Sequence, residues 1–167
     1  RRVCSTWELD VKLYEPVEQI IRENEMHRVI TPKGKYIAKA VILSLGFYDL
    51  PYLLNVPGED LRKVKHYYDE PHPYFAQNII VVGAANSAVD VALETYRKGA
   101  NVTMVIRESA ILDSVKYWVK PDIENRIKEG SIKAYFNSAI LEIKPSLVTV
   151  RTPEGIISIE NDFVLAM

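Results

Sequence analysis

Residues 78–88 are Asn-Ile-Ile-Val-Val-Gly-Ala-Ala-Asn-Ser-Ala, and this stretch decides the fold that the sequence predicts. An apolar run typical of a buried strand leads into Gly83, and a helical pattern begins at Asn86. A turn from strand to helix presents free backbone N–H groups and the positive end of the helix dipole, and both suit a phosphate group. The stretch therefore predicts a site for the pyrophosphate of a dinucleotide.

The spacing of small residues in this turn follows the dinucleotide pattern G-x-G-x-x-G/A with one departure. Gly83 occupies the first position, where the chain turns tightly, and Ala88 the third, where helix and strand pack closely. Ala85 occupies the second and adds a methyl group where the pyrophosphate would approach. A degenerate motif is weak evidence alone, so a purely structural turn stays an alternative. The candidate cofactor-binding residues here are Gly83, Ala84, Ala85, Asn86, Ser87 and Ala88.

The elements around this turn predict an α/β fold. Residues 86–98 carry a stripe of small side chains at helical spacing, which suits close packing on a sheet, and Gly99 follows as a C-terminal cap. We expect a second helix at 120–128 and strands at 101–106, 132–136, 139–143, 147–150, 156–159 and 163–166. The prediction is a Rossmann-like dinucleotide-binding domain with a central parallel sheet and a β-meander, flanked by an antiparallel part.

The end of the second strand bears on which dinucleotide is bound. In sites for NAD, an acidic residue about 20 residues past the glycines binds the ribose 2′-OH. Arg107 stands at that place and would instead bind a 2′-phosphate, although Glu108 follows directly. This favours NADPH, with NADH as the less favoured ligand and a solvated Arg107 as the structural alternative. Lys116 is a second candidate cation if the loop after Ser109 folds back.

The part of the chain before residue 78 predicts short strands and then a connector. Residues 9–14 alternate apolar and polar side chains, and strands are expected at 17–22 and 27–31. Residues 37–46 end in an apolar run that predicts a strand buried on both faces. Prolines in residues 47–75 predict a connector with little regular structure.

Composition excludes several kinds of site. The net charge of -1, from 21 basic and 22 acidic residues, gives no basic field for nucleic acid or a membrane surface. Cys4 is the single cysteine, so no disulfide, CxxC pair or multi-cysteine metal site is expected, and the three histidines are too scattered for a metal site.

No signal peptide is evident, so a cytoplasmic setting is expected. The start without Met and the apolar end predict a piece of a longer protein.

Several stretches resemble the thioredoxin-reductase-like flavoproteins. Residues 82–90, Val-Gly-Ala-Ala-Asn-Ser-Ala-Val-Asp, resemble their NADPH-binding turn, and an arginine after the next strand is usual there. Residues 41–46 resemble their second flavin-domain signature, residues 56–60 the segment leading into the nicotinamide domain, and residues 162–167 the strand before re-entry into the flavin domain. Alanines at 84 and 85 and Ser44-Leu45 depart from the usual residues.

Within that group the chain is most similar to the bacillithiol-disulfide reductases. The shared stretches are Gly-Phe-Tyr-Asp at 46–49, Pro-Gly-Glu-Asp at 57–60, His-Tyr at 66–67 and His-Pro-Tyr-Phe at 72–75. Thioredoxin reductases carry a CxxC in the region of residues 66–75, and this chain does not. The resemblance therefore argues against a dithiol relay through this domain.

The resemblance implies a role. Residues 1–58 would be a remnant of the FAD-binding domain with a connector, and residues 59–167 the NAD(P)H-binding domain. NADPH would pass a hydride to FAD held by the missing half of the same protein, for reduction of a low-molecular-weight disulfide or another acceptor. The cofactors carry this chemistry, so no catalytic residue is named and the chain alone is expected to be inactive. A homo-oligomer is left open.

Three alternatives stay open. Two are other flavoproteins, a thioredoxin-reductase-like ferredoxin–NADP reductase and a flavin monooxygenase. The third is a non-catalytic module that binds NAD(P)H as a sensor.

Overall fold

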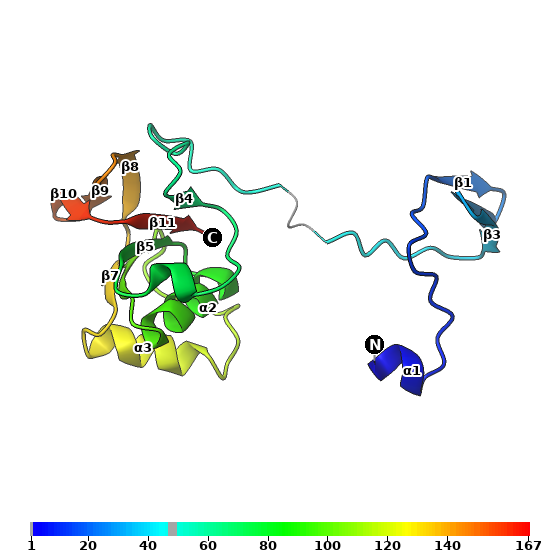
Figure 1. The fold of residues 1–167 in the computed structure, drawn as a ribbon, viewed down its shortest axis with the longest axis horizontal. Coiled ribbons are helices and arrows are strands. Elements are labelled where there is room, and N and C mark those ends of the chain that lie inside the picture. Colours follow the sequence, from blue (N-terminus) through cyan, green and yellow to red (C-terminus); the bar gives the residue numbers. More distant parts are fainter. Residues whose placement is uncertain (1, 47–49) are drawn as a thin grey trace. The chain divides into compact units, whose positions relative to one another are not determined.

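The computed structural model describes residues 2–46 and 50–167. Its contacts divide the chain into two units, Arg1–Phe47 and Tyr48–Met167 (Figure 1). The first unit holds a short helix, α1 (Arg2–Thr6), and an antiparallel sheet in the order β1-β2-β3, formed by β1 (Gln19–Glu23), β2 (Met26–Thr31) and β3 (Gly34–Ala38). The Thr31 hydroxyl accepts the N–H of Gly34 at 3.0 Å and so closes the second turn. The predicted antiparallel meander is confirmed.

Two strand predictions in this unit are wrong. Residues 9–14 form no strand, and after β3 ends at Ala38 the apolar run up to residue 46 is irregular. Ile42 and Leu45 are 89% and 79% exposed. A strand buried on both faces needs hydrogen-bonded neighbours and covering layers. Among the described residues of this unit the only sheet is the three-stranded meander, so the apolar pattern has nothing to pair with.

The second unit is built on a parallel sheet with the strand order β4-β11-β5-β6-β7, as predicted for an α/β fold. The strands are β4 (Val64–Lys65), β5 (Asn78–Val82), β6 (Asn101–Val105), β7 (Lys133–Tyr135) and β11 (Phe163–Ala166). A 3-10 turn, η1 (His72–Tyr74), precedes β5. The helices α2 (Asn86–Arg97) and α3 (Lys120–Lys128) lie on one side of this sheet (Figure 1).

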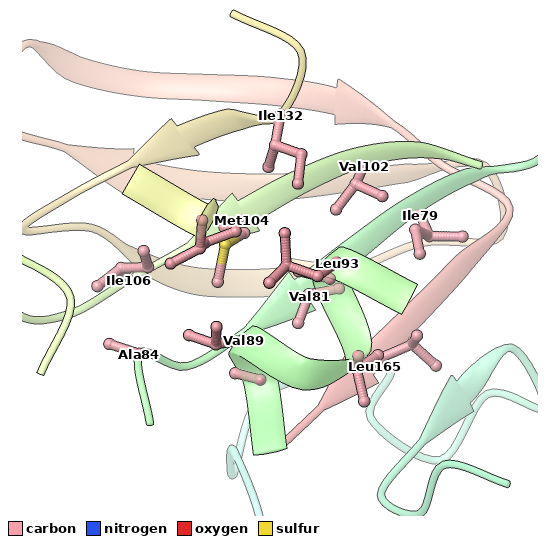
Figure 2. Packing of buried hydrophobic residues seen from close by; sticks show 14 of the residues in the cluster. Ile79, Val81, Ala84, Val89, Leu93, Val102, Met104, Ile106, Ile132 and Leu165 are labelled. Atoms are coloured by element: carbon pink, nitrogen blue, oxygen red, sulfur yellow. The ribbon is translucent and has the colours of Figure 1, made fainter. Parts of the chain in front are cut away.

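The small-residue stripe of α2 packs on the sheet as its spacing predicts. Ala88, Val91, Ala92 and Thr95 are all at most 3% exposed. Figure 2 shows side chains from β5, β6 and β11 gathered against this helix. Small side chains let the helix approach the strands closely, which places its N-terminus at the carboxyl edge of the sheet.

The opposite face of the sheet is covered by an antiparallel meander. It consists of β8 (Ala139–Ile143), β9 (Leu147–Thr152) and β10 (Gly155–Glu160) in the order β10-β9-β8. Neighbouring residues of β5 point to opposite faces, because side chains alternate along a strand. Ile79 and Val81 therefore join the core under α2, whereas Ile80 joins a second core with residues of the meander. The predicted β-meander is confirmed.

The described part of the connector, residues 50–75, holds only β4 and η1 as regular structure, as its prolines predict, and it is packed within the second unit. The N–H of Ile143 donates to the carbonyl of Pro57 at 2.9 Å, and a side chain on Gly58 would meet the Ile143 backbone. Burial, together with the nearby Glu94 carboxylate, raises the pKa of Tyr68. By contacts the connector belongs to the second unit, and the functional boundary at residues 58–59 stays a prediction.

The helices that the structure describes are all too short or too polar to cross a membrane. The location of the protein stays a prediction from the sequence.

Candidate nucleotide-binding cleft

A cleft of about 400 Å³ opens at the carboxyl edge of the parallel sheet. Open α/β sheets bind their ligands at this edge, beyond the carboxyl ends of the strands. The lining residues come from the connector, from the ends of β5, β6 and β11 with the turns that follow, and from the start of β8. They are Tyr52, Leu53, Leu54, Asn55, Val82, Gly83, Ala84, Ala85, Val105, Arg107, Glu108, Leu112, Ser138, Ala139, Ile140, Ala166 and Met167.

Gly83 makes the turn from β5 toward α2. Its φ is +127°, a backbone conformation that residues other than glycine rarely adopt. A Cβ atom here would lie 2.7 Å from the carbonyl oxygen of Met167 and 3.2 Å from Cβ of Ala88. The turn is therefore closed against both β11 and the first turn of α2, and it admits only glycine without strain.

The N-terminus of α2 begins directly after this turn. Ala85 is its extended N-cap residue and supplies no side-chain cap, and its carbonyl accepts the N–H of Val89 at 3.0 Å. The first N–H groups of any helix have no partner within the helix. With the helix dipole they form an arrangement suited to a pyrophosphate. Ala84 and Ala85 line the cleft, whereas Asn86, Ser87 and Ala88 are not among its lining residues.

The side chain of Asn86 holds the loop that follows β6. Its Nδ2 donates to the carbonyl of Ser114 at 3.0 Å, and its Oδ1 accepts the N–H of Lys116 at 3.0 Å. The N–H of Leu112 also donates to the carbonyl of Ala84 at 3.3 Å. The loop thus folds back onto the glycine turn. The sequence made Lys116 a candidate cation only if this loop folded back.

Lys116 itself points to a different partner. Its ammonium group lies 2.8 Å from a carboxylate oxygen of Asp90 on α2, and the residue is not among those lining the cleft. Both side chains are about half exposed. Such a pair is weak and can exchange partners.

Arg107 and Glu108 line the same cleft, at the end of β6. Backbone hydrogen bonds to the segment before β8 hold this strand end: Asn137 donates to the carbonyl of Glu108 at 3.0 Å, and Ser138 to that of Ile106 at 2.8 Å. Arg107 is exposed and Glu108 is half-buried. The structure therefore brings the predicted glycine turn and the predicted cation into one cleft.

Sequence reasoning missed the rest of the lining. Residues 52–55, Leu112, residues 138–140 and Met167 come from irregular segments or strand ends far apart in the sequence. Such segments have no hydrophobic periodicity, so no sequence pattern marked them as part of a site. In the ranges 2–46 and 50–167, no three His, Cys, Asp or Glu side chains gather as a group that could hold a metal ion.

The fold is that of the thioredoxin-reductase-like proteins. A thioredoxin reductase from Lactococcus lactis shares it at 22% identity, with a TM-score of 0.69 over 91% of this chain and 52% of that one. All of residues 1–167 match the model of the pyridine nucleotide-disulphide oxidoreductases, so the chain belongs to this family. The family consists of oxidoreductases, and membership implies the use of a flavin and a nicotinamide dinucleotide.

The chain is similar to reductases of two kinds. It is 40% identical over 146 residues to the bacilliredoxin reductase Bdr of Bacillus subtilis (strain 168), which covers 87% of this chain and 45% of that protein. A ferredoxin–NADP reductase of Ignicoccus hospitalis is 29% identical over 127 residues, 73% of this chain and 40% of that protein.

A solved structure agrees with the first likeness. The bacillithiol disulfide reductase Bdr from Bacillus cereus matches with 38% identity and a TM-score of 0.81 over 100% of this chain and 53% of that one. The chain thus spans about half the length of the relatives it matches.

Proposed function

We propose that the cleft binds NADPH and that the chain is the NADPH-binding segment of an FAD-dependent oxidoreductase. The observation that carries the proposal is that the tight turn at Gly83, the N-terminus of α2 and Arg107 meet at one edge of the parallel sheet. An uncapped helix end suits a pyrophosphate, and a guanidinium suits a 2′-phosphate.

Each of these groups has a distinct role in the proposal. The backbone of residues 83–85 and the first N–H groups of α2 hold the pyrophosphate, and Arg107 donates to the 2′-phosphate. Lys116 can leave Asp90 for the same phosphate, because its loop already lies on the turn. When bound, NADPH supplies a hydride for the FAD of the complete protein, and the residues of this chain orient the nucleotide.

We further propose that the complete protein reduces a low-molecular-weight disulfide. The similarity to Bdr proteins at 38–40% identity supports this choice. Residues 1–58 would then belong to the FAD-binding domain and its connector. The second candidate is a ferredoxin–NADP reductase, supported by the more distant likeness at 29% identity.

Isothermal titration of the chain with NADPH tests the proposed site. The proposal predicts one binding event per chain that Gly83→Val abolishes, because a β-branched side chain cannot adopt the turn and would fill the space next to Met167. Absence of binding by the parent chain, with circular dichroism showing that it is folded, would refute the assignment.

A further inference from the structure

The carboxylate of Glu59 holds one wall of the cleft. It accepts the backbone N–H of Leu54 at 2.5 Å and that of Asn55 at 2.7 Å, one on each oxygen. Leu54 and Asn55 both line the cleft. The side chain of Glu59 is 14% exposed, so both hydrogen bonds are formed by a largely buried charge. Hydrogen bonds to an ionised acceptor are about twice as strong as neutral ones.

His66 lies beside the same carboxylate. Its Nε2 lies 3.4 Å from Oε1 of Glu59, and its side chain is 16% exposed. His66 directly follows β4, which pairs in parallel with β11. A residue next to the central sheet thus lies beside the carboxylate that holds the connector wall.

The wall has no regular structure of its own, so the Glu59 carboxylate supplies acceptors that a helix or strand would otherwise provide. Residues 50–63 lie in no helix or strand, and Asn55 has a left-handed backbone with φ at +55°. Backbone groups outside regular structure must be satisfied by other partners. Leu54 also packs against the core between the sheet and the meander, so the wall has a second anchor besides Glu59, and the loss of Glu59 should loosen the wall without unfolding the core.

We infer that Glu59 is a positioning residue for the nucleotide. It acts through the backbone of Leu54 and Asn55 and holds the connector wall of the cleft in the shape that receives NADPH. This inference rests on the proposed function of the cleft. It assigns a role to the Pro-Gly-Glu-Asp stretch beyond that of a link between domains.

The test is titration of NADPH into the parent chain and three variants. Glu59→Ala removes both acceptors and frees the wall from this carboxylate, so it raises Kd about tenfold. Glu59→Gln keeps one acceptor oxygen and raises Kd about threefold. Glu124→Ala, which removes an exposed carboxylate on α3 beside Lys120, leaves Kd unchanged.

Amide hydrogen exchange separates positioning from a general loss of stability. In Glu59→Ala the amides of Leu54 and Asn55 exchange much faster, while the exchange of those in β5 and α2 changes little. Uniformly faster exchange across the sheet would overturn the inference in favour of a structural role.

Other outcomes are equally decisive. If the parent binds NADPH and Glu59→Ala binds it with the same Kd, the inference fails and the proposed function stands. If the folded parent does not bind NADPH, both fail. If Glu59→Ala does not fold, Glu59→Gln decides, and an unchanged Kd in that variant overturns the inference.

Discussion

Only glycine fits at position 83 for two reasons: φ is positive, and a side chain would meet the carbonyl of Met167 just after β11. Gly83→Ala should therefore destabilise the chain by roughly 1–3 kcal/mol through backbone strain and also weaken NADPH binding, because the added methyl pushes against the carbonyl of Met167. Thermal unfolding and titration calorimetry measure the two effects.

Gly155 supplies the matched control for this variant. Its φ is +135°, yet a Cβ atom there meets nothing within 4 Å. Gly155→Ala should lower the melting temperature by strain alone and leave the affinity for NADPH unchanged. If Gly83→Ala binds NADPH as the parent does, the turn does not touch the nucleotide.

Lys116 was predicted as a second cation for the 2′-phosphate, but in the structure its ammonium group is paired with Asp90. If it changes partner when nucleotide binds, Lys116→Ala should weaken NADPH by up to about fivefold, in line with the roughly 1 kcal/mol of an exposed ion pair. NADH should be little affected, because it lacks the 2′-phosphate. Lys120→Ala, which removes a nearby ammonium paired with Asp113, is the control and should behave as the parent. Equal effects on both nucleotides would exclude a contact of Lys116 with the 2′-phosphate.

At the scale of elements, the loop after β6 is held to α2 by the two hydrogen bonds of Asn86. Asn86→Ala should free this loop, so that its amides exchange faster and NADPH binds more weakly. The cost in stability should be about 1 kcal/mol, since the bonds are solvent-exposed. Asn101→Ala removes a side chain that donates to Asn78 near the start of β5 and β6, and it should leave the loop unchanged. Unaltered loop exchange in Asn86→Ala would contradict the proposed link.

Elements with an internal pattern could be predicted from the sequence. The small-residue stripe of α2 marks the side of the helix that is buried, and the apolar run of β5 marks a strand buried on both faces, so the core of the parallel sheet follows from local residues. The glycine turn and Arg107 were predicted for the same reason, as they flank these elements. Glu59 and residues 52–55 were missed, because their role depends on long-range contacts of an irregular segment.

The same reasoning explains the strands that were predicted wrongly. Residues 39–46 have the composition of a buried strand, but composition does not supply neighbours. A strand forms only where its N–H and C=O groups find partners. Residues 9–14 have a different pattern, an alternation of apolar and polar side chains, but they remain irregular for the same reason.

At the scale of the molecule, the chain spans about half the length of its relatives and contains one dinucleotide-type turn in the sequence. We therefore predict that the purified chain holds no stoichiometric flavin and shows no disulfide reductase activity with NADPH. Absorbance spectroscopy and an NADPH-consumption assay measure this. Flavin near one equivalent per chain would contradict the division of roles, as would NADPH consumption that persists in Cys4→Ser.

The preference for the 2′-phosphate tests the central claim most directly. The measurement is calorimetric titration of 2′,5′-ADP and of 5′-AMP into the parent chain and into Arg107→Ala. A charge-assisted hydrogen bond contributes about 1.5–3 kcal/mol, so the parent should bind 2′,5′-ADP roughly ten- to a hundredfold more tightly than 5′-AMP. Arg107→Ala should lose most of this difference while keeping its affinity for 5′-AMP. Equal affinities in the parent, or an undiminished preference in the variant, would contradict the account.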